Sequence, residues 1–290
     1  MSIAPPVLHV GCPMWAQRAW VGRFLPYDTP SGRELHPYSR FVNAVEGNTT
    51  FYALPPATTV AKWADLAHLD FRFVFKVPRT ITHDQRLVDV DDELAAFVAL
   101  MAPLGDRIGG FTLQLPPSFG PRDLGALARV LSGVPTDWRW SVEVRHPDFY
   151  GGSGRRSLEA LLLRHGAEWV LLDTIQLFHR TPYSDEGRDE WRTKPRVPLM
   201  IEPLTDHPIV RFIGSDHPEL TDLGLQRWQP LIADWIDEGR TPTVFVHTPD
   251  NERTPALARC FHDAVAQLVP RLTPLPEALP VGGPEQIALF

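Results

Sequence analysis

Eight short apolar runs constrain the fold of this 290-residue chain more than any other feature. They occupy residues 7–10, 42–45, 71–75, 111–113, 140–142, 170–172, 209–210 and 244–246. Each run ends on residues that can do chemistry, and helix-like segments fill most of the gaps, which is the pattern of a parallel sheet. If eight such strands close into a barrel, their polar ends meet at one mouth, where barrels of this kind keep their active sites. We therefore predict an α/β fold with a single (β/α)8 TIM-barrel-like domain over residues 1–269.

Helical periodicity supports the same architecture. In residues 57–68, Val60, Trp63 and Ala67 can share one face of a helix. Further helices are expected at 91–101, 122–131, 157–164, 225–236 and 255–269, with a weaker one at 32–41. Residues 176–208 form a long connection in which the charges at 183–192 show no apolar stripe. A connection of that length in a compact fold usually covers or completes a site, or is disordered, and we favour a lid over the barrel mouth.

Composition excludes several classes of protein. The formal net charge of −7 argues against strong generic binding to nucleic acid or to a membrane surface, which usually needs a basic face. No apolar stretch approaches the roughly 20 residues that span a bilayer, and the N-terminus lacks the pattern of a signal peptide. The two cysteines, Cys12 and Cys260, indicate no disulfide framework. We expect a cytoplasmic protein.

The richest strand end is Glu143-Val144-Arg145-His146. In a strand, Glu143 and Arg145 point to the same side, where the guanidinium keeps the carboxylate ionised and oriented. Glu143 is then either an acid/base group or half of a structural ion pair. Lys76 follows Phe71, Phe73 and Phe75, so it is either a binder of anions or, with a lowered pKa, a nucleophile for imine formation.

These patterns predict an enzyme, either a hydrolase or a lyase, that uses acid/base chemistry on a small polar or anionic substrate. Phosphate, sugar and nucleic-acid-derived molecules all fit this mixture of charges. The expected catalytic residues are Glu143, Lys76, Asp173 and His247. The expected substrate-binding residues are Glu46, Asn48, Tyr52, His83, Gln114, Arg145, His146 and Arg211.

Two further hypotheses concern the same mouth. A divalent metal can be held by His and carboxylate ligands, and the candidates are His83, His146, His247, Glu46, Glu143, Asp173 and Asp250. No closely spaced ligand motif occurs, so the sequence requires no metal. Aromatic residues near the first strand ends either stack on a flat ligand or form an apolar wall, and these are Trp15, Trp20, Phe51 and Tyr52.

A tail begins after residue 269. Residues 270–290 are rich in proline and cannot form the interior of a helix or sheet. The chain finishes with Gln286-Ile287-Ala288-Leu289-Phe290, which resembles the peptide by which bacterial replication and repair proteins bind the DNA sliding clamp. Gln286, Leu289 and Phe290 are the expected contacts. The alternatives are a non-catalytic, clamp-associated accessory protein, or a tail that folds back and plugs the barrel.

Several motifs together resemble one family. They are Gly47-Asn48-Thr49-Thr50-Phe51-Tyr52, Gln114-Leu115-Pro116-Pro117-Ser118-Phe119, Val142-Glu143-Val144-Arg145-His146-Pro147 and Arg211-Phe212-Ile213-Gly214-Ser215-Asp216. The chain is similar along nearly its whole length to the YecE-like proteins, domain of unknown function 72. The resemblance implies a TIM-barrel-like fold and no established reaction. Cys12-Pro13-Met14-Trp15 and His247-Thr248-Pro249-Asp250 depart from the family pattern and indicate a subgroup.

Overall fold

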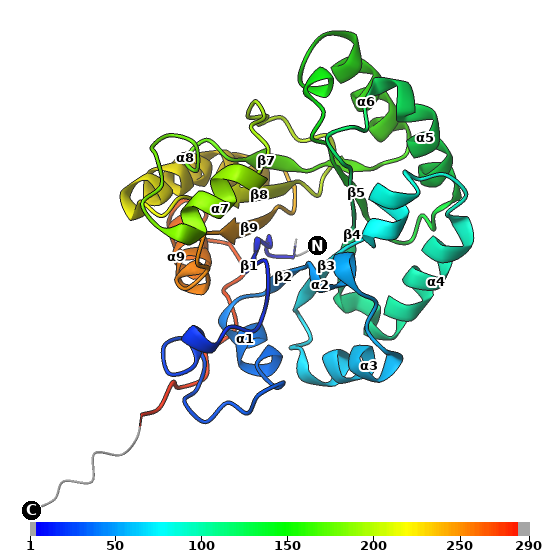
Figure 1. Ribbon diagram of the computed structural model, residues 1–290. Helices are drawn as coiled ribbons and strands as arrows, with labels where there is room; N and C mark the ends of the chain where they lie inside the picture. Colours follow the sequence, from blue (N-terminus) through cyan, green and yellow to red (C-terminus); the bar gives the residue numbers. More distant parts are fainter. Residues whose placement is uncertain (1–3, 284–290) are drawn as a thin grey trace, which may run out of the picture.

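Parallel strands form the centre of the molecule in the computed structural model, which describes residues 4–283 (Figure 1). Each of the eight predicted runs contributes to this sheet. The strands are β1 (His9–Cys12), β2 (Ala44–Gly47), β3 (Arg72–Lys76), β4 (Ile108–Gln114), β5 (Trp140–Glu143), β6 (Glu168–Trp169), β7 (Leu171–Asp173), β8 (Ile209–Ile213) and β9 (Thr243–His247). All their pairings are parallel. The predicted α/β, TIM-barrel-like fold is confirmed.

The sixth predicted run closes the barrel. The strand order is β6-β5-β4-β3-β2-β1-β9-β8-β7, so β6 and β7 lie at opposite ends of the sheet. Only Val170 separates them along the chain, and its backbone N–H donates to Val142 O at 3.0 Å. Strand β6 lies just before the predicted run and pairs with β5, whereas β7 begins within the run and pairs with β8. The nine strands of residues 4–283 therefore occupy eight positions around the barrel.

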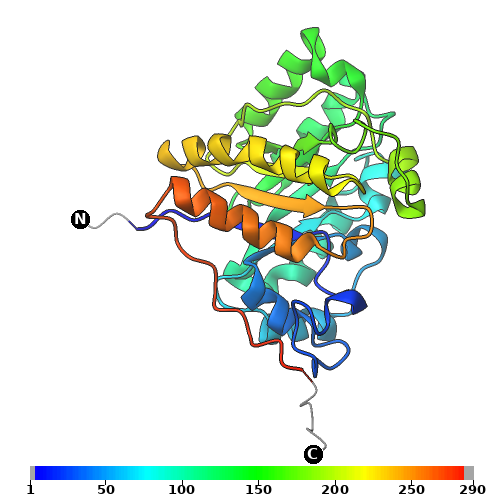
Figure 2. The same cartoon turned by 90° about the vertical axis from the view of Figure 1, so that its left-hand side faces the viewer.

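Helices surround the strands (Figures 1 and 2). They are α1 (Leu35–Phe41), α2 (Thr49–Tyr52), α3 (Ala57–Leu66), α4 (Asp91–Met101), α5 (Leu124–Gly133), α6 (Gly152–Arg164), α7 (Asp185–Thr193), α8 (Pro218–Asp237) and α9 (Thr254–Leu268). Shorter helical turns are η1 (Arg18–Trp20), η2 (Thr80–Asp84), η3 (Ala102–Arg107), η4 (Pro121–Asp123) and η5 (Pro147–Tyr150). None of the described helices in residues 4–283 has the length and apolar character needed to cross a membrane.

Helix α7 lies inside the long connection, where no helix was predicted. Its N-terminus is capped by Ser184, whose Oγ accepts a hydrogen bond from Gly187 N at 2.9 Å. Asp185 and Glu186 in the first turn favour the positive end of the helix dipole. Capping and charge therefore stabilise this helix. The sequence did not predict it because the segment has no apolar stripe.

The barrel interior changes from apolar to charged along the strand direction. Ala44, Val74, Val170, Ile209 and Phe245 form an apolar cluster inside it. Because alternate residues of a strand share a face, the side chain two positions later also points inward. Those positions after Ala44, Val74, Ile209 and Phe245 are Glu46, Lys76, Arg211 and His247. The apolar layer is thus the floor beneath a ring of polar side chains.

The first part of the predicted tail packs on the barrel. Leu272 and Leu275 belong to the buried core, and Thr273 N donates to Pro6 O at 2.8 Å. Further on, Tyr27 N donates to Val281 O at 2.8 Å. The predicted clamp-binding residues Gln286, Leu289 and Phe290 lie outside the described residues.

Candidate functional site

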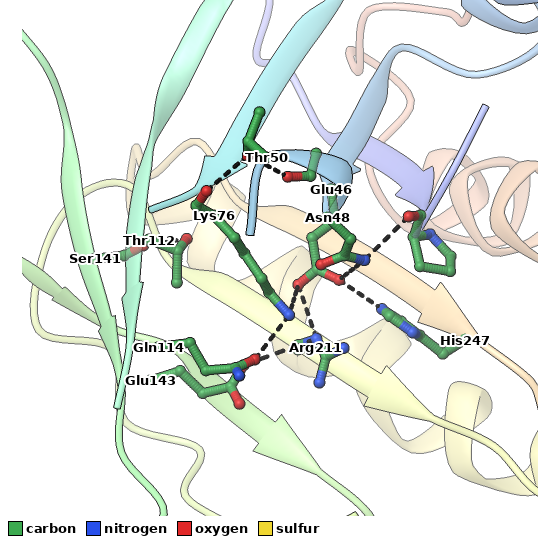
Figure 3. Close-up of polar contacts among 12 residues, drawn as sticks. Glu46, Asn48, Thr50, Lys76, Thr112, Gln114, Ser141, Glu143, Arg211 and His247 are labelled. Atoms are coloured by element: carbon green, nitrogen blue, oxygen red, sulfur yellow. Dashed lines mark hydrogen bonds and ion pairs between the residues drawn. The ribbon is translucent and has the colours of Figure 1, made fainter. Parts of the chain in front are cut away.

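Six polar side chains converge at the C-terminal end of the barrel (Figure 3). Each is at most 6% exposed to solvent. They come from six different strands: Glu46 from β2, Lys76 from β3, Gln114 from β4, Glu143 from β5, Arg211 from β8 and His247 from β9. The convergence expected from the strand ends is therefore present, and burial makes every charge among them depend on its partners.

Glu46 lies at the centre of this group. Its Oε1 accepts a hydrogen bond from Arg211 Nε at 2.7 Å and lies 3.4 Å from Lys76 Nζ. Its Oε2 accepts from Asn48 Nδ2 at 2.9 Å and lies 3.0 Å from His247 Nε2. Burial opposes ionisation, but Arg211 and then Lys76 outweigh it and hold the pKa of Glu46 well below its usual range.

Glu143 is the second buried carboxylate. Arg145 donates to its Oε1 from Nε at 2.9 Å and from Nη2 at 2.7 Å. Arg211 Nε lies 3.7 Å from Glu143 Oε2. Complete burial would raise the pKa of Glu143, yet Arg145 and Arg211 lower it to about 2. Glu143 therefore remains ionised and holds both guanidinium groups in place.

Lys76 and His247 lose part of their basicity by burial. Burial, helped by the nearby Arg211, lowers the pKa of Lys76 to about 8. The Lys76 ammonium donates to Gln114 Oε1 at 2.9 Å. Burial lowers the pKa of His247 to about 3, so this ring is neutral at physiological pH. Of these buried groups, Lys76 has the pKa nearest to neutrality.

A pocket of about 560 Å³ opens above this group. It is lined by Pro13, Met14, Asn48, Phe51, Tyr52, Lys76, Arg79, His83, Gln114, Arg145, Glu190, Thr193, Lys194, Arg211, His247 and Asn251. Five of these side chains are cationic, namely Lys76, Arg79, Arg145, Lys194 and Arg211. The carboxylates that pair with these cations are four, Glu46, Glu143, Glu190 and Asp84, which leaves a net charge of 5 − 4 = +1. Within residues 4–283, Arg211 Nη1 has no hydrogen-bond partner.

Helix α7 supplies a wall that sequence reasoning did not assign to particular residues. Glu190, Thr193 and Lys194 line the pocket, and Lys194 Nζ lies 3.0 Å from Glu190 Oε2. Burial lowers the pKa of Lys194 from its ordinary value. The only available signal was the length of the connection, which indicated a covering segment but not which of its side chains face inward.

The residues after β2 and β3 form the rim. Asn48 Nδ2 also donates to Pro13 O at 3.0 Å, which ties this rim to the end of β1. Gly47 permits the tight packing there, because a Cβ at that position would lie 2.5 Å from the ring of Phe75. His83 lies in η2 with Nδ1 2.9 Å from Thr82 Oγ1, and burial lowers its pKa to about 4. Asn48, Tyr52 and His83 thus line the pocket, and their role in substrate binding stays a prediction.

Comparison with known proteins decides the relationship. Residues 9–280 match the family model described as protein of unknown function DUF72. The chain belongs to the DUF72 family. It is 36% identical over 285 residues to the UPF0759 protein YecE of Escherichia coli K12, covering 98% of this chain and 100% of that relative. The YecE protein of Escherichia coli O157:H7 has the same identity and coverage. The resemblance read from the strand-end motifs is confirmed.

Solved structures of DUF72 proteins share the fold. A DUF72 family protein from Thermotoga maritima superposes with a TM-score of 0.67 at 18% identity, covering 91% of this chain and 98% of that one. A DUF72 protein from Enterococcus faecalis gives a TM-score of 0.66 at 16% identity, with 91% and 96% coverage. At these identities the likeness shows the architecture of the barrel and no activity.

Four of the predicted catalytic and substrate-binding residues of this DUF72 chain do not line the pocket: Glu46 and Glu143 lie beneath it, and Asp173 and His146 point away from it. Asp173 is in register with Phe212, next to the pair of Leu172 and Arg211, so it points outward while Arg211 points inward. Its Oδ2 accepts from Trp228 Nε1 at 2.8 Å and from Arg227 Nη2 at 2.5 Å, which holds α8 against β7. The prediction that Asp173 faces the mouth is wrong, because the strand phase places it on the other face.

His146 is also turned away. It follows Arg145, which does line the pocket, but its Nδ1 accepts from Asp148 N at 3.2 Å and caps η5. Its ring packs against Phe149 at a centroid distance of 6.1 Å. Because Asp173 and His146 point away from the pocket, two of the candidate metal ligands are not available there. Across residues 4–283, no three His, Cys, Asp or Glu side chains are grouped as a metal site requires.

Proposed function

We propose that this DUF72 protein is an enzyme that binds a small anionic substrate in the barrel mouth and transfers a proton through Lys76. The observation that carries the proposal is a buried lysine, with its pKa lowered to about 8, inside a pocket of net positive charge. Perturbed pKa values in a cleft with a specific charge partner are typical of functional sites. The reaction class is hydrolysis or elimination.

The assignment of proton transfer follows from a comparison of Lys76 with the buried groups Glu46, Glu143 and His247. Glu46 stays ionised, because its pKa is held well below its usual range. A general acid or base works best when its pKa lies near the operating pH. The pKa of Glu143 is about 2 and that of His247 about 3, so both stay in one protonation state near pH 7. Lys76, at about 8, exists in both states. In this proposal Glu143 fixes the cations, and the acid/base role expected of it passes to Lys76.

The anion is bound by guanidinium and ammonium groups. Arg211 Nη1 is buried without a hydrogen-bond partner in the described chain, and an unpaired buried donor is unfavourable until a ligand accepts from it. Arg145 and Lys194 line the same pocket. Charge-assisted hydrogen bonds from such groups are strong for phosphate and carboxylate oxygens. An anionic substrate therefore satisfies groups that the protein leaves incompletely satisfied.

Substitution of Lys76 tests both parts of the proposal. A panel of phosphate esters and carboxylic acids is screened for binding by calorimetry and for turnover. Lys76→Met should abolish turnover and weaken binding by about tenfold, as expected for one lost charge-assisted contact. Lys76→Arg should retain binding but lose turnover, because arginine cannot release its proton near neutral pH.

Arg271→Gln serves as the control, since this arginine is in an exposed pair with Asp237. Circular dichroism establishes that each variant is folded. Turnover by Lys76→Arg at the rate of the unmodified chain would overturn the proton-transfer role. Absence of any anion binding would overturn the proposal as a whole.

We also propose, on the terminal sequence alone, that Gln286, Leu289 and Phe290 bind a DNA sliding clamp. Two apolar anchors and an amide at the end of a Pro-rich segment suit a preformed groove. Deletion of residues 286–290 should eliminate binding to purified clamp in a calorimetric titration, while thermal stability stays unchanged. A full-length chain with no affinity for the clamp would end this proposal.

A further inference from the structure

The four aromatic residues near the first strand ends separate into two groups. Trp20 is fully buried and stacks on Tyr38 at a centroid distance of 5.8 Å. Trp15 packs edge-on against Trp63 at 5.1 Å, beside the core. Phe51 and Tyr52 instead line the pocket. Of these four residues, Phe51 and Tyr52 are therefore the two that a ligand in the pocket can contact.

Tyr52 is unusual among the pocket residues because 76% of it is exposed. Its ring meets Phe51 edge-on, with centroids 5.1 Å apart and planes at 89°. Phe51 in turn meets His83 edge-on at 5.1 Å. Burial of a large aromatic side chain is favourable, but the ring of Tyr52 is not buried by the fold itself. A ligand that covers the ring gains that free energy.

Hydrogen bonds hold helix α2, which carries Tyr52, in place. Helix α2 is fastened by Thr50, whose Oγ1 donates to Gly47 O at 2.9 Å and to Lys76 O at 2.7 Å (Figure 3). At the end of the helix, Ala53 N donates to Thr49 O at 3.1 Å. The bond to Lys76 O connects the residue carrying the buried ammonium to the helix carrying the exposed ring. The spacing between cationic floor and aromatic rim is therefore set by hydrogen bonds.

We propose that the substrate carries a planar aromatic ring, which packs on Tyr52 while its anionic group lies on the cationic floor at Lys76 and Arg211. This inference rests on the proposed function. Aromatic rings pack on one another in offset or edge-to-face arrangements that gain more than their buried area alone. The pocket volume of about 560 Å³ is within the range of small-molecule sites. It leaves room for a ring and a phosphate or carboxylate together.

Matched pairs of probes separate planarity from hydrophobicity. Phenyl phosphate is compared with cyclohexyl phosphate, and benzoate with cyclohexanecarboxylate, by calorimetric titration of the full chain. We expect the planar member of at least one pair to bind about fivefold more tightly, as one aromatic contact contributes. Tyr52→Ala should remove this preference, and Tyr52→Phe should keep it.

Tyr27→Ala is the matched control, because Tyr27 is also largely exposed, at 61%, and does not line the pocket. Equal affinity for planar and saturated rings, or an unchanged preference in Tyr52→Ala, would overturn the ring subsite. If Lys76→Met nevertheless weakens both members of a pair, the anion-binding proposal stands without it. If neither pair binds and no other anion does, both proposals fail.

Discussion

Each end of the barrel buries a carboxylate, but the groups around the two carboxylates differ. Cationic side chains surround the one, and mainly backbone amides surround the other. Glu46, at the C-terminal end, is held by Arg211 and Lys76. Glu168, where β6 begins, accepts hydrogen bonds from Trp169 N at 2.8 Å, Leu204 N at 3.0 Å and Thr205 N at 2.9 Å. The cations lower the pKa of Glu46, whereas burial raises the pKa of Glu168 despite its three amide donors and the Thr205 hydroxyl.

This difference distinguishes a carboxylate with a structural role from one in the proposed binding site. Around Glu168 three of the four donors are backbone amides, and the neighbouring pocket has a volume of only about 60 Å³. Around Glu46 the donors are side chains with capacity left over, facing about 560 Å³ of space. A carboxylate saturated by amides joins two segments of the fold. A carboxylate that gathers cations beneath an open pocket supports the proposed anion site, at the end where barrels carry their chemistry.

Removing the charge at the mouth should have the largest effect on stability. Glu46→Gln leaves Arg211 and Lys76 buried without their main counter-ion, and breaking a buried ion pair by removing one partner costs about 3–5 kcal/mol. We expect a loss of that size in the free energy of unfolding, measured by urea denaturation. Glu219→Gln is the control, because Glu219 is exposed and pairs with Arg180 at the surface. A loss below about 1 kcal/mol would mean that the cations do not depend on Glu46.

The matched change at the other end should cost less and leave binding intact. Glu168→Gln turns one oxygen into a donor that meets the N–H or O–H of Thr205, so one or two hydrogen bonds are lost. We expect a decrease of about 1–3 kcal/mol in the free energy of unfolding. Affinity for an anion at the mouth should match that of the unmodified chain. Loss of anion binding in a folded Glu168→Gln protein would contradict the division between the two ends.

The barrel could be predicted because its signal repeats. Eight apolar runs with helical segments between them specify parallel strands, and inward-facing positions two residues after the apolar layer specify where polar side chains meet. Lys76 and Glu143 are the last residues of β3 and β5, and His247 is the last residue of β9. Their convergence follows from topology, so a single sequence was sufficient to predict it.

The remaining parts of the site depend on information that is not local. Asp173 also ends its strand, yet its side chain points out of the barrel. Its partner in the neighbouring strand β8 is Phe212, which faces outward, whereas Leu172 is the partner of the inward-facing Arg211. A fully buried strand is apolar on both faces, so its sequence does not reveal that phase. Lys194 reaches the pocket only because α7 packs above the mouth, and no periodicity predicts such a placement.

Acid titration should distinguish the two ends with the smallest but most specific effect. The pKa of Glu143 is about 2 in the folded protein against an ordinary 4.5, so its stabilising contribution is complete above about 4.5 and is lost as the pH falls towards 2. The stability gap between the unmodified chain and Glu143→Gln should therefore shrink on acidification, by at most about 1.4 kcal/mol per pH unit.

For Glu168→Gln, the stability of the unmodified chain relative to the variant should increase on acidification. Because the folded-state pKa of Glu168 is raised, the folded protein binds a proton more readily than the unfolded chain, and the unmodified chain gains stability over this variant as the pH falls through that pKa. Urea denaturation of the three proteins between about pH 7 and pH 3 measures both gaps, and subtraction cancels the titrating groups that do not interact with either carboxylate. Gaps that shift in the same direction would show that both carboxylates experience one kind of environment, which would remove the electrostatic basis for placing the site at the mouth.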